Sequence, residues 1–341
     1  MRLSTYIIRR AILVIFSLIG LSVLVFVLAR VLPGDPARMV AGARAEEWVV
    51  EQLRKQLRLD KPLYEQYFYW VGDIFRGELG YSILTKRDVV TDVLEYLPAS
   101  LELIFLAAIF QLIGAFALGV VAGRYSYKWP DNMVRIASYV GISVPAFVLA
   151  IVFQLVFGWW VKWFPIQGVI TSGIELPPTV TGMATLDSLI AGRVDTFLNV
   201  LWHMVLPALA LCMGGMLQDA RIIRAGMVEN KDKDYIALAS AQGLPERTIT
   251  FRYLLKPSVI PAVTIMGLDI AALMANAFLV ESVFNWPGFS KLGMRYMFNK
   301  DLNGIVALVL VIGVIYAVAN IVVDIVVAYL DPRIRLMERG E

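Results

Sequence analysis

Two residue types that often build catalytic and metal sites are almost absent from this chain of 341 residues. It contains one cysteine, Cys212, and one histidine, His203. A single cysteine excludes an intramolecular disulfide framework and a site with several thiolate ligands. A single histidine excludes a multi-histidine metal site. With no catalytic motif around either residue, we expect no catalytic residue, no metal and no cofactor in this chain.

A phosphate-binding loop is also missing. The sequence has no Gly-x4-Gly-Lys-Ser/Thr segment, so the chain is not expected to bind ATP in the familiar way. Any ATP hydrolysis would then belong to separate subunits. The formal net charge is only +3, which is too small to predict a nucleic-acid partner.

What the chain has is hydrophobic length, with 59% hydrophobic residues and a mean hydropathy of +0.69. Such a composition is too apolar for a soluble domain, so we expect the chain to lie in a membrane and to contact lipid. Runs of about 20 apolar residues can cross a hydrocarbon core about 30 Å thick. We therefore predict an all-α membrane protein with six transmembrane helices, in which Pro145 and Pro207 favour kinks. The predicted spans are 11–31, 101–121, 136–161, 197–217, 258–280 and 302–323.

The first apolar run could instead be a secretory signal. It is longer than a signal core, and no small-x-small cleavage site follows it, so we expect a retained helix. Basic residues then gather in the loops on one side, at 124–135 and 221–256, and in the C-terminal tail. Because such an excess marks the cytoplasmic side, both termini are predicted to be cytoplasmic.

These spans divide the chain into four predicted parts. They are a cytoplasmic N-terminus with the first transmembrane helix (1–31), an external helical segment (32–97), a five-helix core with a cytoplasmic loop at 221–257 (98–330), and a cytoplasmic tail (331–341). The external segment is expected to hold a helix at 46–57 and another after Pro62. It either shields the helix ends or contributes a landing surface for an external partner.

The loop between the fourth and fifth spans has the pattern of a short, smooth helix. Asp234 is a good N-cap for a helix over 235–242, Gly243 suits a helix stop, and Pro245 can open a second helix at its first position. Small side chains suit docking into a groove on another protein, although an ordinary interhelical loop has the same spacing. The residues that favour docking are Asp234, Tyr235, Ala237, Ala239, Ala241 and Gly243.

Polar residues inside the spans are costly in lipid and normally face protein or water. Asp269 lies within the fifth span, and Asn276 follows two helical turns later on the same face. The two could line a translocation path, or Asp269 could fix helix packing through a hydrogen bond. Glu102 and Glu281 are expected at the outer water interface, whereas Asp324 is expected to have a structural partner.

The segment from Met227 to Leu244, followed by Pro261-Ala-Val-Thr264, resembles the cytoplasmic loop of ATP-binding-cassette importer permeases, in the branch for dipeptides, oligopeptides and nickel. The usual Glu-Ala-Ala triplet is replaced by Ala237-Leu238-Ala239, which weakens any claim about a specific ion pair. Similar motifs follow one another along the chain: Arg30-Val-Leu-Pro-Gly-Asp-Pro36, Leu59-Asp-Lys-Pro-Leu63, Gly77-Glu-Leu-Gly80, Gly141-Ile-Ser-Val-Pro145, Glu281-Ser-Val-Phe284 and Asp331-Pro-Arg333. The segment 162–199 departs from the pattern, because it looks longer than the usual loop.

The resemblance implies a permease that pairs with a second, similar permease, two cytoplasmic ATP-binding subunits and an external substrate-binding protein. The loop helix would be the coupling helix that docks into an ATPase subunit. The implied substrates are dipeptides or oligopeptides first, with oligosaccharides and nickel complexes as alternatives. Two readings from other classes stay open: a secondary transporter in which Asp269 carries a proton, and a membrane scaffold without a path.

Overall fold

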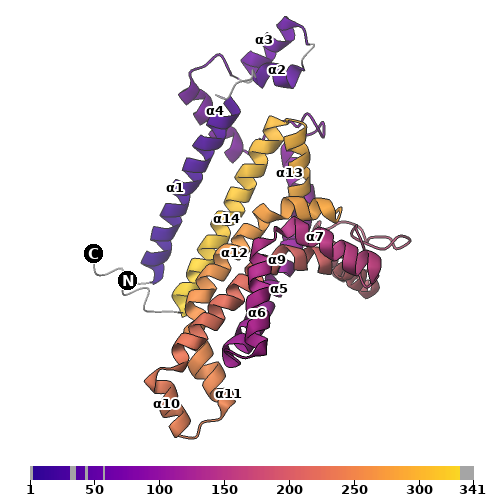
Figure 1. The fold of residues 1–341 in the computed structure, drawn as a ribbon. Helices are drawn as coiled ribbons and strands as arrows, with labels where there is room; N and C mark the ends of the chain where they lie inside the picture. Colours follow the sequence, from indigo (N-terminus) through magenta and orange to yellow (C-terminus); the bar gives the residue numbers. More distant parts are fainter. Residues whose placement is uncertain (1–2, 31–35, 43–44, 57, 331–341) are drawn as a thin grey trace.

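The computed structural model describes residues 3–30, 36–42, 45–56 and 58–330, and in these ranges the chain folds into helices joined by loops (Figure 1). Five of these helices are long and apolar enough to span a membrane. They are α1 (Leu3–Arg30), α5 (Val89–Arg124), α9 (Val194–Lys231), α12 (Lys256–Val283) and α14 (Leu302–Leu330). The all-helical prediction is confirmed for the described residues, with between five and six candidate spans.

The predicted third span, 136–161, is not one straight helix. α6 (Trp129–Ser143) ends before Pro145, and α7 (Ala146–Phe153) leaves it at an angle of 110°, continuing through the π-helical turn η1 (Gln154–Trp160). The break has a local cause, because a residue that precedes proline is disfavoured in the helical region. Val144 accordingly has extended backbone angles, φ −95° and ψ 121°. A sixth crossing exists only if α6, α7 and η1 together count as one broken span.

Two other helices extend past their predicted limits. α5 begins at Val89, so the expected boundary between an external segment and the core at residue 97 falls inside one continuous helix. α9 runs on to Lys231, past the predicted end of the fourth span at residue 217. This added length includes Asp219, which lies beyond the predicted span and is buried in the helix bundle.

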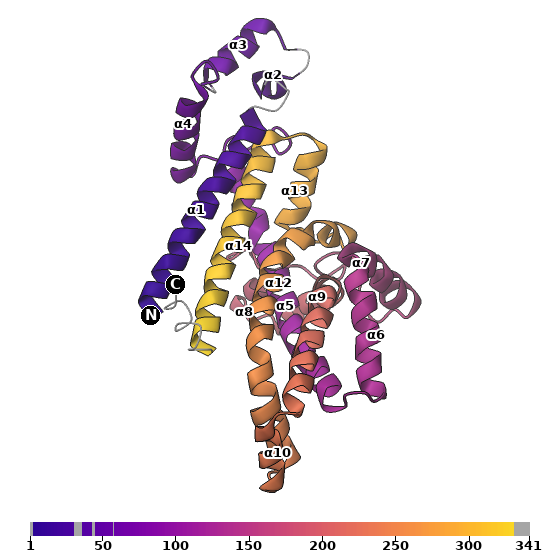
Figure 2. The same cartoon turned by 60° about the vertical axis from the view of Figure 1, so that its left-hand side comes forward.

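The short helices lie at opposite ends of the molecule. α2 (Pro36–Ala41), α3 (Glu47–Gln56) and α4 (Leu63–Phe75) lie at one end, whereas α10 (Asp234–Ala241) and α11 (Glu246–Thr248) project at the other. The first turn of α1 and the last turn of α14 point toward the α10 end in both views (Figure 2). α1 packs along α14, and Arg10 Nε lies 3.3 Å from Asp324 Oδ2 between them. The structural partner expected for Asp324 is therefore present.

α5 and α9 pack closely along each other, because glycines let their backbones approach. A Cβ atom added to Gly119 of α5 would lie 2.8 Å from Cβ of Ile223 on α9. One turn further on, a Cβ at Gly123 would lie 2.8 Å from Cβ of Met227. Leu103 of α5 and Leu206 of α9 are buried in the same core, together with Leu273 from α12.

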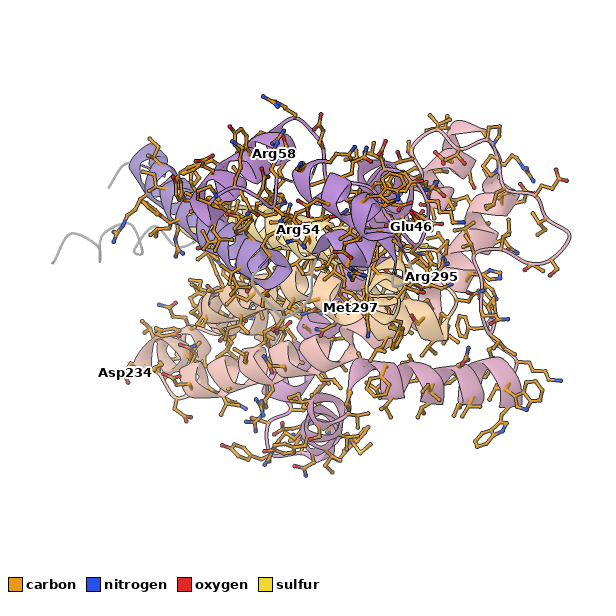
Figure 3. The ribbon with its side chains drawn as sticks, turned by 90° about the horizontal axis from the view of Figure 1, so that it is seen from above. Glu46, Arg54, Arg58, Asp234, Arg295 and Met297 are labelled. Carbon is orange, nitrogen blue, oxygen red and sulfur yellow. The ribbon has the colours of Figure 1, made fainter. Side chains whose placement is uncertain are left out.

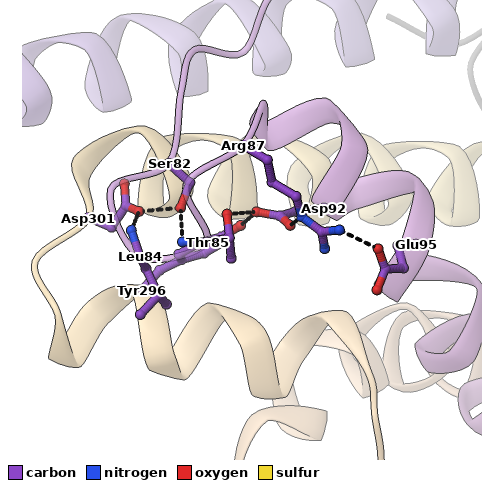
Figure 4. A network of polar contacts seen from close by, with 8 residues as sticks. All are labelled: Ser82, Leu84, Thr85, Arg87, Asp92, Glu95, Tyr296 and Asp301. Carbon is purple, nitrogen blue, oxygen red and sulfur yellow. Dashed lines mark hydrogen bonds and ion pairs between the residues drawn. The ribbon is translucent and has the colours of Figure 1, made fainter.

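A polar network fixes the turn that leads into α5 (Figure 4). Asp301, before α14, accepts hydrogen bonds from Ser82 Oγ at 2.5 Å and from the Leu84 amide at 3.0 Å. Asp92 of α5 is fully buried and is paired with Arg87 and with the hydroxyl of Tyr296, which lies on α13 (Phe289–Phe298). The network therefore ties the start of α5 to α13 and α14, and both buried carboxylates have partners, as burial requires.

Candidate coupling and translocation site

The predicted loop helix exists as α10 (Asp234–Ala241), with small differences at its ends. Lys233, not Asp234, is the N-cap residue, and no side chain forms a capping hydrogen bond. Gly243 follows the helix with φ +72°, the left-handed conformation that favours glycine. Pro245 precedes α11 as its N-cap residue and is not its first helical residue. The helix stop at Gly243 was thus predicted correctly, and the N-cap role of Asp234 was wrong.

α10 has one inward and one outward face. Ile236 and Ala239 are buried, in packing against the π-helical turn η2 (Ile249–Leu255) that leads into α12. Ala239 is only 3% exposed, so the expectation that it belongs to an outward docking face is wrong. The outward residues are Asp234, Tyr235, Ala237, Leu238, Ala241 and Gly243.

The outward face combines small residues with one large apolar one. Ala237 and Ala241 are one helical turn apart, and Leu238 beside them is 59% exposed. Asp234 lies at the rim of the molecule when it is seen from above (Figure 3). Tyr235 is 40% exposed. Its hydroxyl donates to Asn230 Oδ1 of α9 at 2.7 Å, and partial burial raises the pKa of this phenol. An exposed leucine between two alanines is an apolar contact surface that suits a protein partner.

A buried ion pair joins α9 to α6 near this end of the molecule. Arg224 donates to both carboxylate oxygens of Asp131, at 2.8 and 2.7 Å, and Asp131 also accepts from the Tyr127 amide at 2.8 Å. Asp131 is fully buried. In the same region Arg124 pairs with Glu246 of α11 at 2.7 Å. The loop between α5 and α6 is thereby fixed to the base of the α10 and α11 segment.

Arg224→Gln is expected to destabilise the protein by about 3–5 kcal/mol, because it leaves the buried Asp131 carboxylate without a counter-charge. Chemical denaturation of the purified complex in detergent micelles measures this loss. The double variant Arg224→Gln/Asp131→Asn removes both charges and should recover most of the stability. Equal stability of the single variant and the wild type would show that the pair contributes nothing.

Two carboxyl groups meet in the middle of the bundle. Asp219 of α9 is fully buried and lies close to Asp269 on α12. Its Oδ1 atom has no hydrogen-bond partner among the described residues. Each carboxyl group also accepts a hydrogen bond from an amide side chain: Gln111 Nε2 donates to Asp219 at 2.8 Å, and Gln218 Nε2 donates to Asp269 at 3.3 Å. Four polar side chains from α5, α9 and α12 therefore form one cluster, which we call the carboxyl cluster.

Sequence reasoning singled out Asp269 but missed Asp219. Asp219 lies two residues beyond the predicted end of the fourth span, so it was not considered among the polar residues inside the spans. One signal was available in the sequence. Gln218 and Asp219 form a polar pair directly after an apolar run, and they can lie beside Asp269 only if the helix continues past residue 217. Asn276, the other predicted path residue, lies on an exposed part of α12. It does not belong to the carboxyl cluster.

Glu102 and Glu281 are not at the water interface, which corrects the sequence-based expectation. Glu281 is fully buried and accepts from Ser100 Oγ at 2.5 Å and from the Lys291 amide at 2.8 Å. Glu102 is also buried and accepts the first amides of α8 (Ala184–Ile190), from Thr185 at 2.6 Å and Ala184 at 3.2 Å. Both carboxylates hold the α2–α4 end of the bundle together.

The segment 162–199 is folded against this end. The Gly168 amide donates to the Phe284 carbonyl at 2.9 Å. Burial would raise the pKa of Asp187, but the hydrogen bonds that Thr181 donates to it hold the pKa below its usual value. The segment, the start of α5 and the loop after α12 form an open cavity of about 220 Å³, which is lined by Asp187, Glu102 and Trp286 among others. His203 beneath it is buried and paired with the Asn199 carbonyl at 2.8 Å.

Comparison with known proteins gives a consistent result over nearly the whole chain. Residues 115–336 match the family described as binding-protein-dependent transport system inner membrane component, and residues 3–104 match the N-terminal region of the same kind of protein. The probable D,D-dipeptide transport system permease protein of Escherichia coli (strain K12) is 38% identical over 315 residues, which are 92% of this chain and 93% of that protein.

Two further relatives cover even more of the chain. The dipeptide transport system permease protein of Alkalihalophilus pseudofirmus is 31% identical over 97% of this chain and 99% of its own length. The glutathione transport system permease protein of Escherichia coli (strain K12) is 32% identical over 97% of this chain and 98% of its own length.

Proposed function

Because the chain belongs to the family of binding-protein-dependent transport system inner membrane components, we propose that it is the permease subunit of an ATP-driven importer for small peptides. Membership of this family and the apolar helices make it a multi-pass protein of the inner membrane. The observation that carries the proposal is the full-length similarity to permeases named for dipeptides and glutathione. These names favour small peptides over oligosaccharides or nickel complexes.

The proposed assembly contains a second permease, two cytoplasmic ATP-binding subunits and an external substrate-binding protein. The outward face of α10 is the proposed contact with an ATP-binding subunit, through Asp234, Tyr235, Ala237, Leu238, Ala241 and Gly243. Ala239 supports this face from beneath. The proposed translocation path runs past Asp269 and the exposed Asn276. We add Asp219 as a buried neighbour of Asp269 in the carboxyl cluster.

We propose that α10, the start of α1 and the end of α14 are cytoplasmic and that α2–α4 are external. Labelling of single cysteines introduced at positions 60 and 232, after Cys212→Ala, tests this orientation. Position 60 should react only from the outside, and position 232 only from the inside. Cys212 is fully buried, so its replacement should not change the labelling pattern of the other sites. Reaction from the opposite sides would overturn the topology.

Uptake by proteoliposomes tests the function itself. The complex is reconstituted with the subunits that co-purify with this chain, and a labelled dipeptide is added with the binding protein. We expect uptake to require ATP on the side of the membrane on which α10 lies. Uptake should not change when a proton gradient is applied. Uptake driven by a proton gradient without ATP would instead support a secondary transporter.

A further inference from the structure

An apolar groove runs between the first and last membrane helices, which lie side by side in both ribbon views. It has a volume of about 480 Å³ and contains few polar groups. Its lining residues include Leu18 and Leu21 of α1 and Val309, Ile312 and Tyr316 of α14. On α14 these positions repeat at helical spacing, so they form one continuous stripe along the helix.

A second cavity lies farther along the same two helices, at the α2–α4 end. This cavity has a volume of about 460 Å³ and is lined by Arg30 at the end of α1, by Trp70 of α4 and by Val306 of α14. Val306 precedes Val309 of the groove by one helical turn. A molecule with a long apolar part and a polar end could therefore occupy both spaces at once.

Exposed aromatic side chains place the membrane interface at the level of this cavity. The apolar stretch of α1 ends at Arg30. On α4, Tyr64, Phe68 and Phe75 share one helical face and are 65%, 71% and 87% exposed. A helix with such an aromatic face is typical of the boundary between lipid headgroups and acyl chains.

Polar groups of both signs converge in the cavity. Arg30 is partly buried and, among the described residues, forms no hydrogen bond or ion pair. Lys300 adds a second cation. Of the acidic residues, Asp73 pairs with Arg58 at 3.3 Å and Asp301 accepts from Ser82 and Leu84. Glu78 lies on the wall without a partner in the described chain.

Gln66 supplies a buried hydrogen-bond acceptor at the same place. It lines an adjoining cavity of about 250 Å³ that also includes Arg30, Trp70 and Glu78. Its amide Nε2 donates to the Lys61 carbonyl at 2.7 Å, which fixes the orientation of the group. Its Oε1 is buried and has no partner in the described chain. A ligand that donates a hydrogen bond would satisfy this atom.

We propose that the groove and the cavity together bind one phospholipid of the phosphatidylethanolamine class. The acyl chains lie along α1 and α14, and the phosphate is held by Arg30 and Lys300. The headgroup ammonium donates to Gln66 Oε1 and approaches Glu78. This arrangement matches the order of charges in a zwitterionic headgroup, with the anion next to the glycerol and the ammonium beyond it. The lipid therefore adds contacts between α1 and the rest of the bundle at the α2–α4 end. The Arg10–Asp324 ion pair joins α1 to α14 only at the opposite end.

Native mass spectrometry of the delipidated complex tests this site. Phosphatidylethanolamine, phosphatidylglycerol and phosphatidylcholine with identical acyl chains are each titrated into the complex that co-purifies with the full chain. We expect phosphatidylethanolamine to bind about tenfold more tightly than phosphatidylcholine, whose quaternary ammonium has no hydrogen-bond donor. Equal or tighter binding of phosphatidylglycerol would overturn the assignment.

Variants of the charged residues locate the lipid. Arg30→Gln should weaken the binding of phosphatidylethanolamine about tenfold, because a charge-assisted hydrogen bond to phosphate is lost, and Arg30→Lys should keep most of it. Glu78→Gln should reduce the preference for phosphatidylethanolamine over phosphatidylcholine. Arg295→Gln, on the exposed surface of α13 and outside the cavity, is the matched control. Wild-type binding by Arg30→Gln, with the complex still assembled, would overturn the proposal.

Discussion

Replacement of Ala237 by tryptophan is expected to abolish the stimulation of ATP hydrolysis by loaded binding protein, while the complex stays assembled. Ala237 is exposed on α10, so the larger side chain causes no clash within the chain itself. In a groove on an ATP-binding subunit it would overfill the contact, at a cost of about 1–3 kcal/mol, on the order of a 10- to 100-fold loss of affinity. ATPase activity in proteoliposomes measures the stimulation, and co-purification measures assembly.

The same substitution two residues later, on the buried face of α10, gives the control. Ala239→Trp places the indole against η2 within the chain's own core, so it should lower the yield of folded permease. Ala237→Ser keeps the small size and should behave as wild type. Normal stimulation in Ala237→Trp would move the contact to another surface, such as the loop 124–135.

Asp269→Asn is expected to reduce peptide uptake roughly tenfold and to leave the amount of assembled complex unchanged. The asparagine keeps an oxygen that can accept from Gln218 Nε2, so the packing around α12 is retained and only the charge is lost. A carboxylate inside a membrane span costs at least about 2.5 kcal/mol at insertion, so a charge retained there is expected to serve transport. Uptake of a labelled dipeptide by proteoliposomes measures the effect.

A second aspartate provides the comparison. Asp324→Asn removes a carboxylate from a different membrane helix, α14, where the charge is paired with Arg10, and it should leave uptake near wild type. Because Asp219 and Asp269 belong to the same carboxyl cluster, the double variant should differ from the sum of the single effects by about 0.5–3 kcal/mol. If Asp269→Asn prevents assembly instead, the residue serves packing and not the path.

α10 shows which structural features a local sequence pattern can predict and which it cannot. Gly243 could be placed correctly as the helix stop because positive φ is a property of a single residue and its backbone. Which face of the helix looks outward could not be predicted, since Ala237 and Ala239 are chemically identical. Only the packing of η2 beneath the helix decides that Ala239 is buried and Ala237 is exposed.

The burial of carboxylates was also not predictable from the local sequence, because it depends on contacts between distant segments. Glu102 and Glu281 lie near span ends in the sequence, which suggested water, yet each is enclosed by segments far away along the chain: Thr185 donates to Glu102, and Ser100 donates to Glu281. Asp219 was not predicted as a site residue, because hydropathy marks where an apolar run ends and not where the helix ends. Helical hydrogen bonds continue along α9 to Lys231.

The sequence by itself determined that this protein is an all-helical membrane protein, because the length of an apolar run and the energy of its transfer into lipid are additive along the chain. The sequence also predicted the position of the polar segment that forms α10 and the family to which the chain belongs. It indicated a kink at Pro145 but not a complete break between two helices. The tertiary structure alone decided which side chains meet: the carboxyl cluster of Asp219 and Asp269, and the groove between α1 and α14. Such contacts join residues far apart in sequence, and they depend on the angle and register at which whole helices pack.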